Sequence, residues 1–292
     1  MHTNVIYDVG AHVGEDTEFY LKKGFKVVAV EANPALVSYL KERFHANLSD
    51  GSLVIVDSAI ADKSGMVSFY VNERSCWGTI DFAFAERNAM LGCPSQVDQV
   101  QAVTFTEVLR QYGVPYYLKI DIEGADTLCL KGLAESPEKP RYMSIESDKR
   151  SWKALMQEFQ LLKSLGYSKF KIVDQALVPQ QRTPSPSVEG RDVSHVFEPG
   201  ASGLFGGELP GKWLTMGQAI RRYRLIYLSY YLSGDSGILH RARLKFSGSE
   251  DRKSDHCQRR RSPLRCALNK IATNPSIKSL LKAHWYDTHA TV

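Results

Sequence analysis

Acidic residues at the ends of apolar runs are the clearest sign of chemistry in this sequence. Asp8, Glu31 and Asp121 each stand at the end of a short apolar run that is typical of a buried strand. A carboxylate in that position costs several kcal/mol to desolvate unless it is paired or used. Carboxylates can accept hydrogen bonds from ribose hydroxyls, balance a cationic group or take up a proton. The pattern therefore predicts a ligand site at the strand ends.

The turn after the first run indicates which ligand this is. Gly10, His12 and Gly14 belong to a G-x-x-x-G turn, whereas a dinucleotide site favours G-x-G-x-x-G. Asp8, just before the turn, would repel a pyrophosphate but suits a cationic amine. Glu31 lies 21 residues after Gly10 and is placed to accept hydrogen bonds from two ribose hydroxyls. A ribose with an aminoacyl tail and no phosphate describes S-adenosylmethionine. The alternative is an ordinary α/β core whose glycines only turn the chain.

The rest of the cofactor site is expected along the neighbouring strand ends. Ala32 and Asn33 follow Glu31 directly, and the run at 53–56 ends in Asp57-Ser58-Ala59-Ile60. In a doubly wound sheet this end lies beside Glu31, so Asp57 or a nearby backbone amide is expected at the adenine edge. Asp57 or Ser58 could equally be a helix N-cap.

The segment 119–124 is the strongest candidate for the reacting centre. Lys119 and Asp121 share one face of the strand by period-two alternation. Asp121 could hold the amine of the cofactor or a substrate hydroxyl, and Glu123 could accept a proton. A buried ion pair between Lys119 and one of the acids is the structural alternative.

Contacts with the methyl acceptor are assigned more loosely. The irregular segment 72–94 carries Trp77 and Thr79, which could belong to a lid over the site or could be packing residues. Lys119 and Glu146, the acid that ends the run at 141–146, complete this group of candidates. No His, Asp and Glu spacing specifies a metal site, so none is predicted.

Strands and helices alternate along the first half of the chain, which predicts an α/β fold with a doubly wound, mostly parallel sheet. Helices are expected from residue 15, from Pro34, from Thr104, where Glu107 completes a capping box, and over 151–165. Residues 169–173 and 193–197 are expected to close the sheet as an antiparallel pair.

Composition sets limits on the class of protein. The chain has 292 residues, 43% of them hydrophobic, which allows a sizeable core. No apolar run approaches 18 residues and the first strand begins near residue 5, so neither a signal peptide nor a transmembrane helix is expected. Five cysteines without a CxxC pair argue against a zinc site or a disulfide framework and favour the cytoplasm.

Charge divides the chain into two parts. Residues 1–150 hold 15 Lys and Arg against 21 Asp and Glu, whereas residues 151–292 hold 22 against 11. The sequence predicts a catalytic domain over 1–200 and a partly helical C-terminal extension over 201–292, with a helix at 216–232. The basic segment 247–265 is expected to be flexible. It could touch nucleic acid, but a solvated loop is the preferred interpretation.

Several stretches together resemble the FkbM family of S-adenosylmethionine-dependent methyltransferases. They are VIYDVGAHVGEDTEFYLKKGF, VVAVEANP, VDSAIADKSGMVSFYV, YYLKIDIEGADTLCLKGL and YMSIES, and the resemblance covers roughly residues 4–175. It implies a Rossmann-like class I methyltransferase fold with a C-terminal helical or irregular extension. It also implies an activity that is often O-methylation of hydroxyls on secondary metabolites, sugars or lipid-linked glycans.

The resemblance also places site residues. Those matching the family's cofactor motif are Asp8, Gly10, His12, Gly14 and Glu31, followed by the adenine-side strand end at 57–60. Asp121, Glu123 and Gly124 match the segment nearest the transferred methyl. The expected acceptor is a small molecule or a glycan, and the sequence does not indicate an oligomeric state. Two rival functions are an NAD-dependent oxidoreductase and a non-catalytic or RNA-associated methyltransferase-like module.

Overall fold

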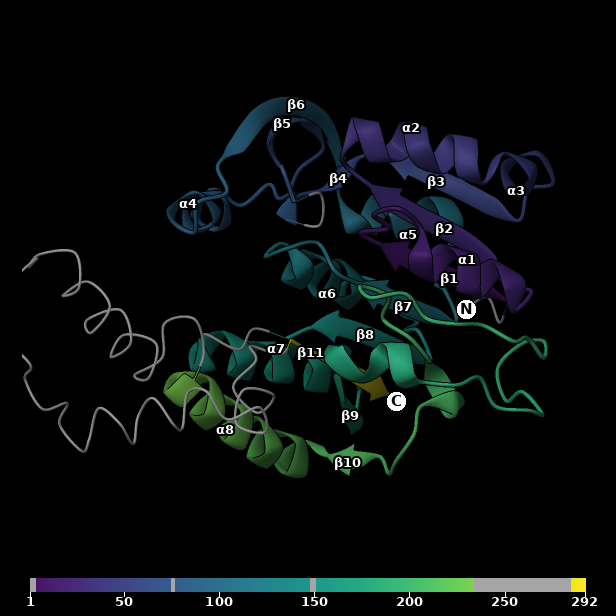
Figure 1. Ribbon diagram of the computed structural model, residues 1–292, viewed down its shortest axis with the longest axis vertical. Coiled ribbons are helices and arrows are strands. Elements are labelled where there is room, and N and C mark those ends of the chain that lie inside the picture. Colours follow the sequence, from purple (N-terminus) through teal and green to yellow (C-terminus); the bar gives the residue numbers. More distant parts are fainter. Residues whose placement is uncertain (1–3, 75–76, 148–150, 234–284) are drawn as a thin grey trace, which may run out of the picture.

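The computed structural model describes residues 4–74, 77–147, 151–233 and 285–292. Its centre is a sheet of eight strands in the order β10-β9-β11-β8-β7-β1-β2-β3 (Figure 1). These strands are β1 (Val5–Val9), β2 (Lys26–Glu31), β3 (Leu53–Asp57), β7 (Tyr117–Ile120), β8 (Tyr142–Glu146), β9 (Lys169–Asp174), β10 (Leu214–Thr215) and β11 (Tyr286–Thr291).

Five neighbouring strands of this sheet, β8, β7, β1, β2 and β3, run parallel. The topological switch point of the sheet lies at β1, because β2 and β3 lie on one side of β1 and β7 and β8 lie on the other. Ligands of open α/β sheets bind at the carboxyl ends of the strands at such a point. The predicted α/β class with a mostly parallel sheet is confirmed.

Helices pack on both faces of the sheet. They are α1 (Glu15–Lys22), α2 (Pro34–Arg43), α3 (His45–Ser49), α5 (Phe105–Tyr112), α6 (Asp126–Ala134), α7 (Trp152–Ser164) and α8 (Met216–Ser233), with short 3-10 turns at Gln175–Gln180 and Gly206–Glu208. Side chains alternate between the faces, as strand geometry requires. On β1, Tyr7 packs in the core with α5 to α8, and Ile6 packs in the core with α1 and α2.

The expected helix starts agree with the local geometry. Pro34 is the first residue of α2, and the Asn33 side chain accepts a hydrogen bond from the Ala35 N–H. Thr104 and Glu107 form the predicted capping box at the start of α5. None of the helices in the described residues is long and apolar enough to cross a membrane.

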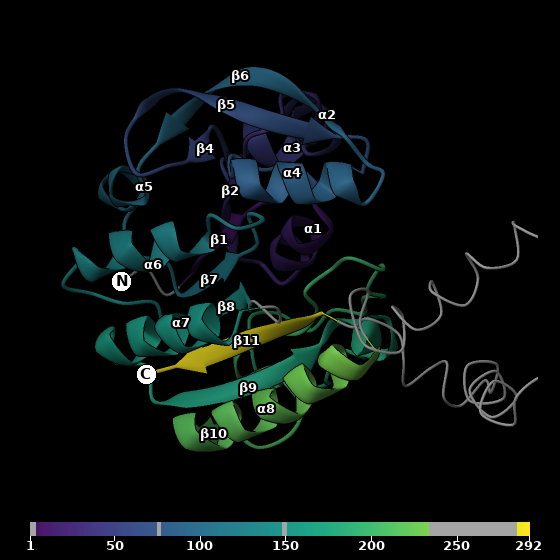
Figure 2. The same cartoon turned by 90° about the vertical axis from the view of Figure 1, so that its left-hand side faces the viewer.

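The strand predicted at 193–197 is wrong, because those residues are irregular. The antiparallel strand inserted beside β8 is instead β11, at the end of the chain, which lies between β8 and β9 (Figure 2). Helix α8, predicted over 216–232, packs against β9 and β10. The region 201–292 therefore supplies part of the central sheet and its cover. The predicted flexible segment 247–265 lies outside the described residues.

A second, three-stranded sheet stands beside the carboxyl ends of β1 to β3. It consists of β4 (Ala59–Ile60), β6 (Ser95–Val103) and β5 (Gly65–Asn72), with helix α4 (Phe82–Met90) packed on it (Figure 2). The sequence analysis predicts neither β6 nor α4, and α4 falls within the irregular segment 72–94. This side sheet, together with the 78–80 segment, forms one wall of the site described next.

Candidate functional site

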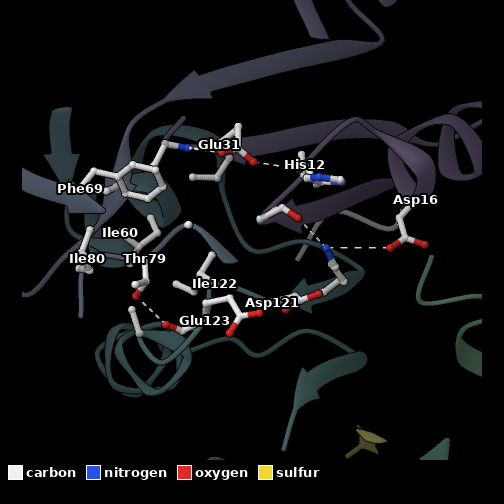
Figure 3. A pocket seen from close by; sticks show the side chains of 18 of the residues that line it. His12, Asp16, Glu31, Ile60, Phe69, Thr79, Ile80, Asp121, Ile122 and Glu123 are labelled. Atoms are coloured by element: carbon white, nitrogen blue, oxygen red, sulfur yellow. Dashed lines mark hydrogen bonds and ion pairs between the residues drawn. The ribbon is translucent and has the colours of Figure 1, made fainter. Parts of the chain in front are cut away.

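A pocket lies at the carboxyl ends of β1, β2 and β7, between the central sheet and the side sheet (Figure 3). It is lined by the turn after β1 with the start of α1, the ends of β2 and β3, part of the side sheet, the loop after β7 and a distant segment. The lining residues are Gly10, Ala11, His12, Glu15, Asp16, Val30, Glu31, Ala32, Ser58, Ala59, Ile60, Phe69, Gly78, Thr79, Ile80, Lys119, Asp121, Ile122, Glu123, Ala125, Pro199 and Gly200.

Gly10 allows the two central strand ends to meet. Its φ is +84°, and a Cβ built on it would stand 1.8 Å from the carbonyl oxygen of Asp121. The Gly10 N–H donates to the carbonyl oxygen of Val30, 2.9 Å away. Only glycine combines this backbone conformation with this close approach. The turn therefore brings the ends of β1, β2 and β7 together at one place.

Glu31 is held rigidly at the middle of the pocket. One carboxylate oxygen accepts the N–H groups of Ala32 and Asn33, at 3.0 and 2.8 Å, and the other accepts the His12 N–H at 2.8 Å. Burial raises the pKa of Glu31, while these backbone hydrogen bonds lower it. Each carboxylate oxygen has two lone pairs, so the oxygen that accepts only the His12 N–H can accept one further hydrogen bond.

Lys119 is the cation at the centre of a buried charged cluster. Its Nζ lies 3.1 Å from Asp8 Oδ1 and 3.9 Å from Asp16 Oδ2, and it donates to the carbonyl oxygen of Gly10 at 2.7 Å. Burial lowers the pKa of Lys119, but Asp8, Asp121 and Asp16 together raise it above its ordinary value. Lys119 therefore neutralises charge on this side of the pocket and fixes the turn after β1.

The loop after β7 presents Asp121 and Glu123 to the pocket. Glu123 has φ +46°, a conformation uncommon for a residue with a side chain, and such residues are found most often at functional sites. Asp126 stabilises the loop by accepting the N–H groups of Ile122 and Gly124, both at 3.0 Å. Burial, together with Glu146 and Asp121, raises the pKa of Glu123 to about 9. Burial beside other carboxylates therefore favours the protonated form of Glu123.

The opposite end of the pocket is apolar. Ile60, Phe69 and Ile80 line it, and Figure 3 shows them on the far side of Glu31 from Asp16. Phe69 is buried in the side sheet, packed with Ala59 and other small residues. The pocket thus runs from an apolar end past Glu31 to a charged end.

Many of the residues predicted for the site are brought together there. Gly10, His12, Glu31, Ala32, Ser58, Ala59, Thr79, Lys119, Asp121 and Glu123 all line the pocket. His12 has φ +52° and its ring pairs with Glu15 at 3.1 Å. This hydrogen bond raises the pKa of His12. Thr79 is buried, and its hydroxyl donates to the carbonyl oxygen of Glu123 at 2.7 Å, so it connects the side sheet to the loop after β7.

Three residues predicted to bind the cofactor contact other parts of the protein and do not line the pocket. Asp8 is fully buried, where it pairs with Lys119 and accepts the Thr17 hydroxyl at 2.6 Å. Gly14 precedes α1 with φ +85°, and a Cβ there would strike the rings and methyls of Phe44 and Leu40. Asn33 is the N-cap of α2. None of the three lines the pocket.

Asp57, Trp77 and Glu146 also lie off the pocket lining. The carboxylate of Asp57 points to Lys41, at 3.1 Å, and both side chains are about half exposed. The guanidinium groups of Arg74 and Arg87 lie 4.5 and 5.6 Å from the centroid of the Trp77 ring. Glu146 ends β8 opposite Asp287 of β11, close enough to Glu123 to raise its pKa.

The lining residues that the sequence does not predict include Glu15, Asp16, Phe69, Ile80, Ile122, Pro199 and Gly200. Glu15 and Asp16 follow the turn after the first strand directly, and that position at a strand end makes an acid a pocket candidate. No local signal points to Pro199 and Gly200, because a contact across 180 residues depends on the complete fold. Among the described residues, no group of three or more His, Cys, Asp and Glu side chains is placed to hold a metal ion.

The family model described as the methyltransferase FkbM domain matches residues 8–169, more than half of the chain. The fold and site therefore belong to a methyltransferase. The chain is a member of the FkbM methyltransferase family. No curated protein sequence matches it.

Solved structures of methyltransferases are similar to this chain at a distance. The methyltransferase FkbM from Methylobacillus flagellatus has 16% identity and a TM-score of 0.42, covering 59% of this chain and 40% of that one. The precorrin-6y C5,15-methyltransferase from Geobacter metallireducens has 10% identity and a TM-score of 0.35, covering 60% and 68%. A methyltransferase from Thiobacillus denitrificans, solved with S-adenosyl-L-homocysteine, has 9% identity and a TM-score of 0.32, covering 99% and 85%.

Proposed function

We propose that this protein is an S-adenosylmethionine-dependent methyltransferase that O-methylates a hydroxyl of a small molecule, sugar or glycan. The observation that carries the proposal is the position of Glu31 between an apolar and a charged end of one pocket. The family membership supports the same activity. We place the reaction in the cytoplasm, because cysteines without disulfide partners, such as Cys93 and Cys129, suit a reducing compartment.

The pocket residues fit this cofactor in chemistry. Ile60, Phe69 and Ile80 offer an apolar surface for a flat base, and the Glu31 oxygen that accepts the His12 N–H can also accept a ribose hydroxyl. Carboxylates outnumber cationic side chains in the lining, which suits a ligand with a positively charged sulfonium and amine.

The cofactor, when bound, supplies a methyl group on a sulfonium, and the neutral thioether that remains after transfer is a good leaving group. The protein therefore mainly has to align the acceptor oxygen with the methyl carbon and the sulfur. Asp121 lines the pocket at the end of β7, where it can accept the proton of the acceptor hydroxyl. The raised pKa of Glu123 favours its protonated form, which can donate a hydrogen bond to the acceptor. The proton-accepting role therefore goes to Asp121 rather than to Glu123.

Asp121→Asn is expected to abolish methyl transfer and to leave S-adenosylhomocysteine affinity within about threefold of wild type, because general-base catalysis typically contributes about 10²–10⁴-fold. The measurement is the transfer of labelled methyl to metabolite or glycan extracts, with calorimetry of S-adenosylhomocysteine in parallel. Full transfer by Asp121→Asn would show that Asp121 is not the base.

Glu31→Gln is expected to weaken S-adenosylhomocysteine binding by roughly 10–100-fold, since it removes charge-assisted acceptors for the ribose and one backbone hydrogen bond. Asp57→Asn is the matched control, because Asp57 ends the adjacent strand but points to Lys41. Calorimetry should show an unchanged affinity for Asp57→Asn. Equal losses in both variants would contradict the ribose role of Glu31.

A further inference from the structure

We propose that Asp16 binds the amine at the amino-acid end of the cofactor, and that residues 198–203, here called the closing segment, complete this end of the pocket. The proposal rests on the proposed function and makes it more specific. It replaces the sequence-based expectation that Asp8 or Asp121 holds the amine.

Asp16 has the position that this role requires. It lies in the first turn of α1, lines the pocket and is 5% exposed. Figure 3 shows it at the end of the pocket opposite Phe69 and Ile80, with Glu31 and His12 between. A nucleoside whose base lies at the apolar end and whose ribose lies at Glu31 would extend its tail toward Asp16.

The carboxylate of Asp16 also has capacity for another donor. Both of its oxygens accept the single N–H of Ser202, at 2.9 and 3.0 Å. Lys119 Nζ lies 3.9 Å away, beyond hydrogen-bond distance, and is engaged more closely by Asp8 and Gly10. A carboxylate has about four lone-pair positions, so an ammonium group can be accommodated beside the Ser202 N–H.

The electrostatics agree with this geometry. Burial raises the pKa of Asp16 to about 7, although Lys119 lowers it, and Asp8 raises it further. The side chain is thus a desolvated acid whose charged form is only partly compensated by the protein. A cationic group placed beside it would favour the charged form and would gain a strong, charge-assisted hydrogen bond.

The other acids nearby are less suitable for an amine. Asp8 is fully buried off the pocket, and its two oxygens face Lys119 and the Thr17 hydroxyl. Glu15 lines the pocket but already pairs with His12 at 3.1 Å.

The closing segment is hydrogen-bonded to α1 through Ser202 and Asp16, and its Ala201 packs in the core. Pro199 and Gly200 line the pocket, and Ala201 and Ser202 are buried beside them. Two residues after Ser202, the Leu204 N–H donates a hydrogen bond to the side-chain oxygen of Gln181. These residues lie beyond the family match, which ends at 169. Recognition of the amine thus uses a part of the chain outside the matched domain.

The test is calorimetry with two ligands, S-adenosylhomocysteine and its deaminated analogue, in which hydrogen replaces the amine. Wild type is expected to bind S-adenosylhomocysteine roughly 10–100-fold more tightly than the analogue. Asp16→Asn, whose amide oxygen can still accept the Ser202 N–H, is expected to bind both ligands with similar affinity, near that of wild type for the analogue.

Glu18→Gln is the matched control on the same helix, because Glu18 pairs with Lys22 and Arg43 near the surface. It is expected to keep the wild-type preference. The preference of wild type is measured without any variant, so the test stands even if Asp16→Asn does not fold. Equal affinities of wild type for both ligands, or an undiminished preference in Asp16→Asn, would overturn the role of Asp16. Failure of wild type to bind either ligand would instead overturn the proposed function, and the role of Asp16 with it.

Discussion

Gly10→Ala is expected to abolish measurable S-adenosylhomocysteine binding and to destabilise the protein by about 3 kcal/mol or more. The added Cβ would stand 1.8 Å from the carbonyl oxygen and 2.8 Å from the carbonyl carbon of Asp121, both of them backbone atoms. Relief requires the turn after β1 and the end of β7 to separate, which moves Asp121 away from Glu31. Urea denaturation and ligand calorimetry measure the two effects.

Gly92→Ala separates the clash at Gly10 from the strain of a positive φ. Gly92 has φ +83°, almost the value of Gly10, but a Cβ there would meet open space. This control is expected to lose about 1 kcal/mol of stability and no ligand affinity. Binding by Gly10→Ala within threefold of wild type would show that the strand ends need not meet as described.

Lys119→Met is expected to destabilise the protein by about 3–5 kcal/mol, because it leaves buried carboxylates without their cation. Asp8 and Asp16 both face Lys119 Nζ in the structure. The double variant Lys119→Met, Asp8→Asn should regain part of the loss, since one of the uncompensated charges is then removed. Chemical denaturation measures the free energy of unfolding of the single and double variants.

The loss in Lys119→Met is also expected to depend on pH. The pKa of Asp16 is raised by burial to about 7, above the ordinary value of an Asp in the unfolded chain. The folded state therefore holds more protons than the unfolded state between pH 4 and 7, and its stability falls as the pH rises through this window. Without Lys119 this effect grows, so the loss should be larger at pH 8 than at pH 5.

Lys41→Met is the control for Lys119→Met, because Lys41 pairs with Asp57 at the same 3.1 Å but with both side chains about half exposed. An exposed pair contributes about 0–1 kcal/mol. A loss of that size in Lys119→Met as well would contradict the view that the buried cluster holds the turn after β1.

The sequence predicts the fold and the central residues of the site because both depend on short-range patterns. Apolar runs followed by an acid define the parallel strands, and parallel strands must carry their ends to one edge of the sheet. Glu31 and Asp121 follow from this rule alone. Gly10 follows from the need for a tight turn between strand and helix.

What the sequence does not predict depends on the direction of side chains and on distant contacts. Asp8 and Asp16 are both acids near the turn, and only the structure shows that Asp8 points into the protein and Asp16 into the pocket. Asp57 ends a parallel strand as Glu31 does, yet points to Lys41. Strand β11 completes the sheet from the end of the chain, and the pattern at 193–197 misleads because Val193 and Phe197 pack in the core without pairing as a strand.

The account depends most directly on whether the wild-type protein binds S-adenosylhomocysteine. Calorimetric titration with this ligand, and separately with NADH, tests it in one experiment. We expect saturable one-to-one binding of S-adenosylhomocysteine and no heat of binding with NADH. Binding of NADH alone, or of neither ligand, would contradict the assignment of the pocket.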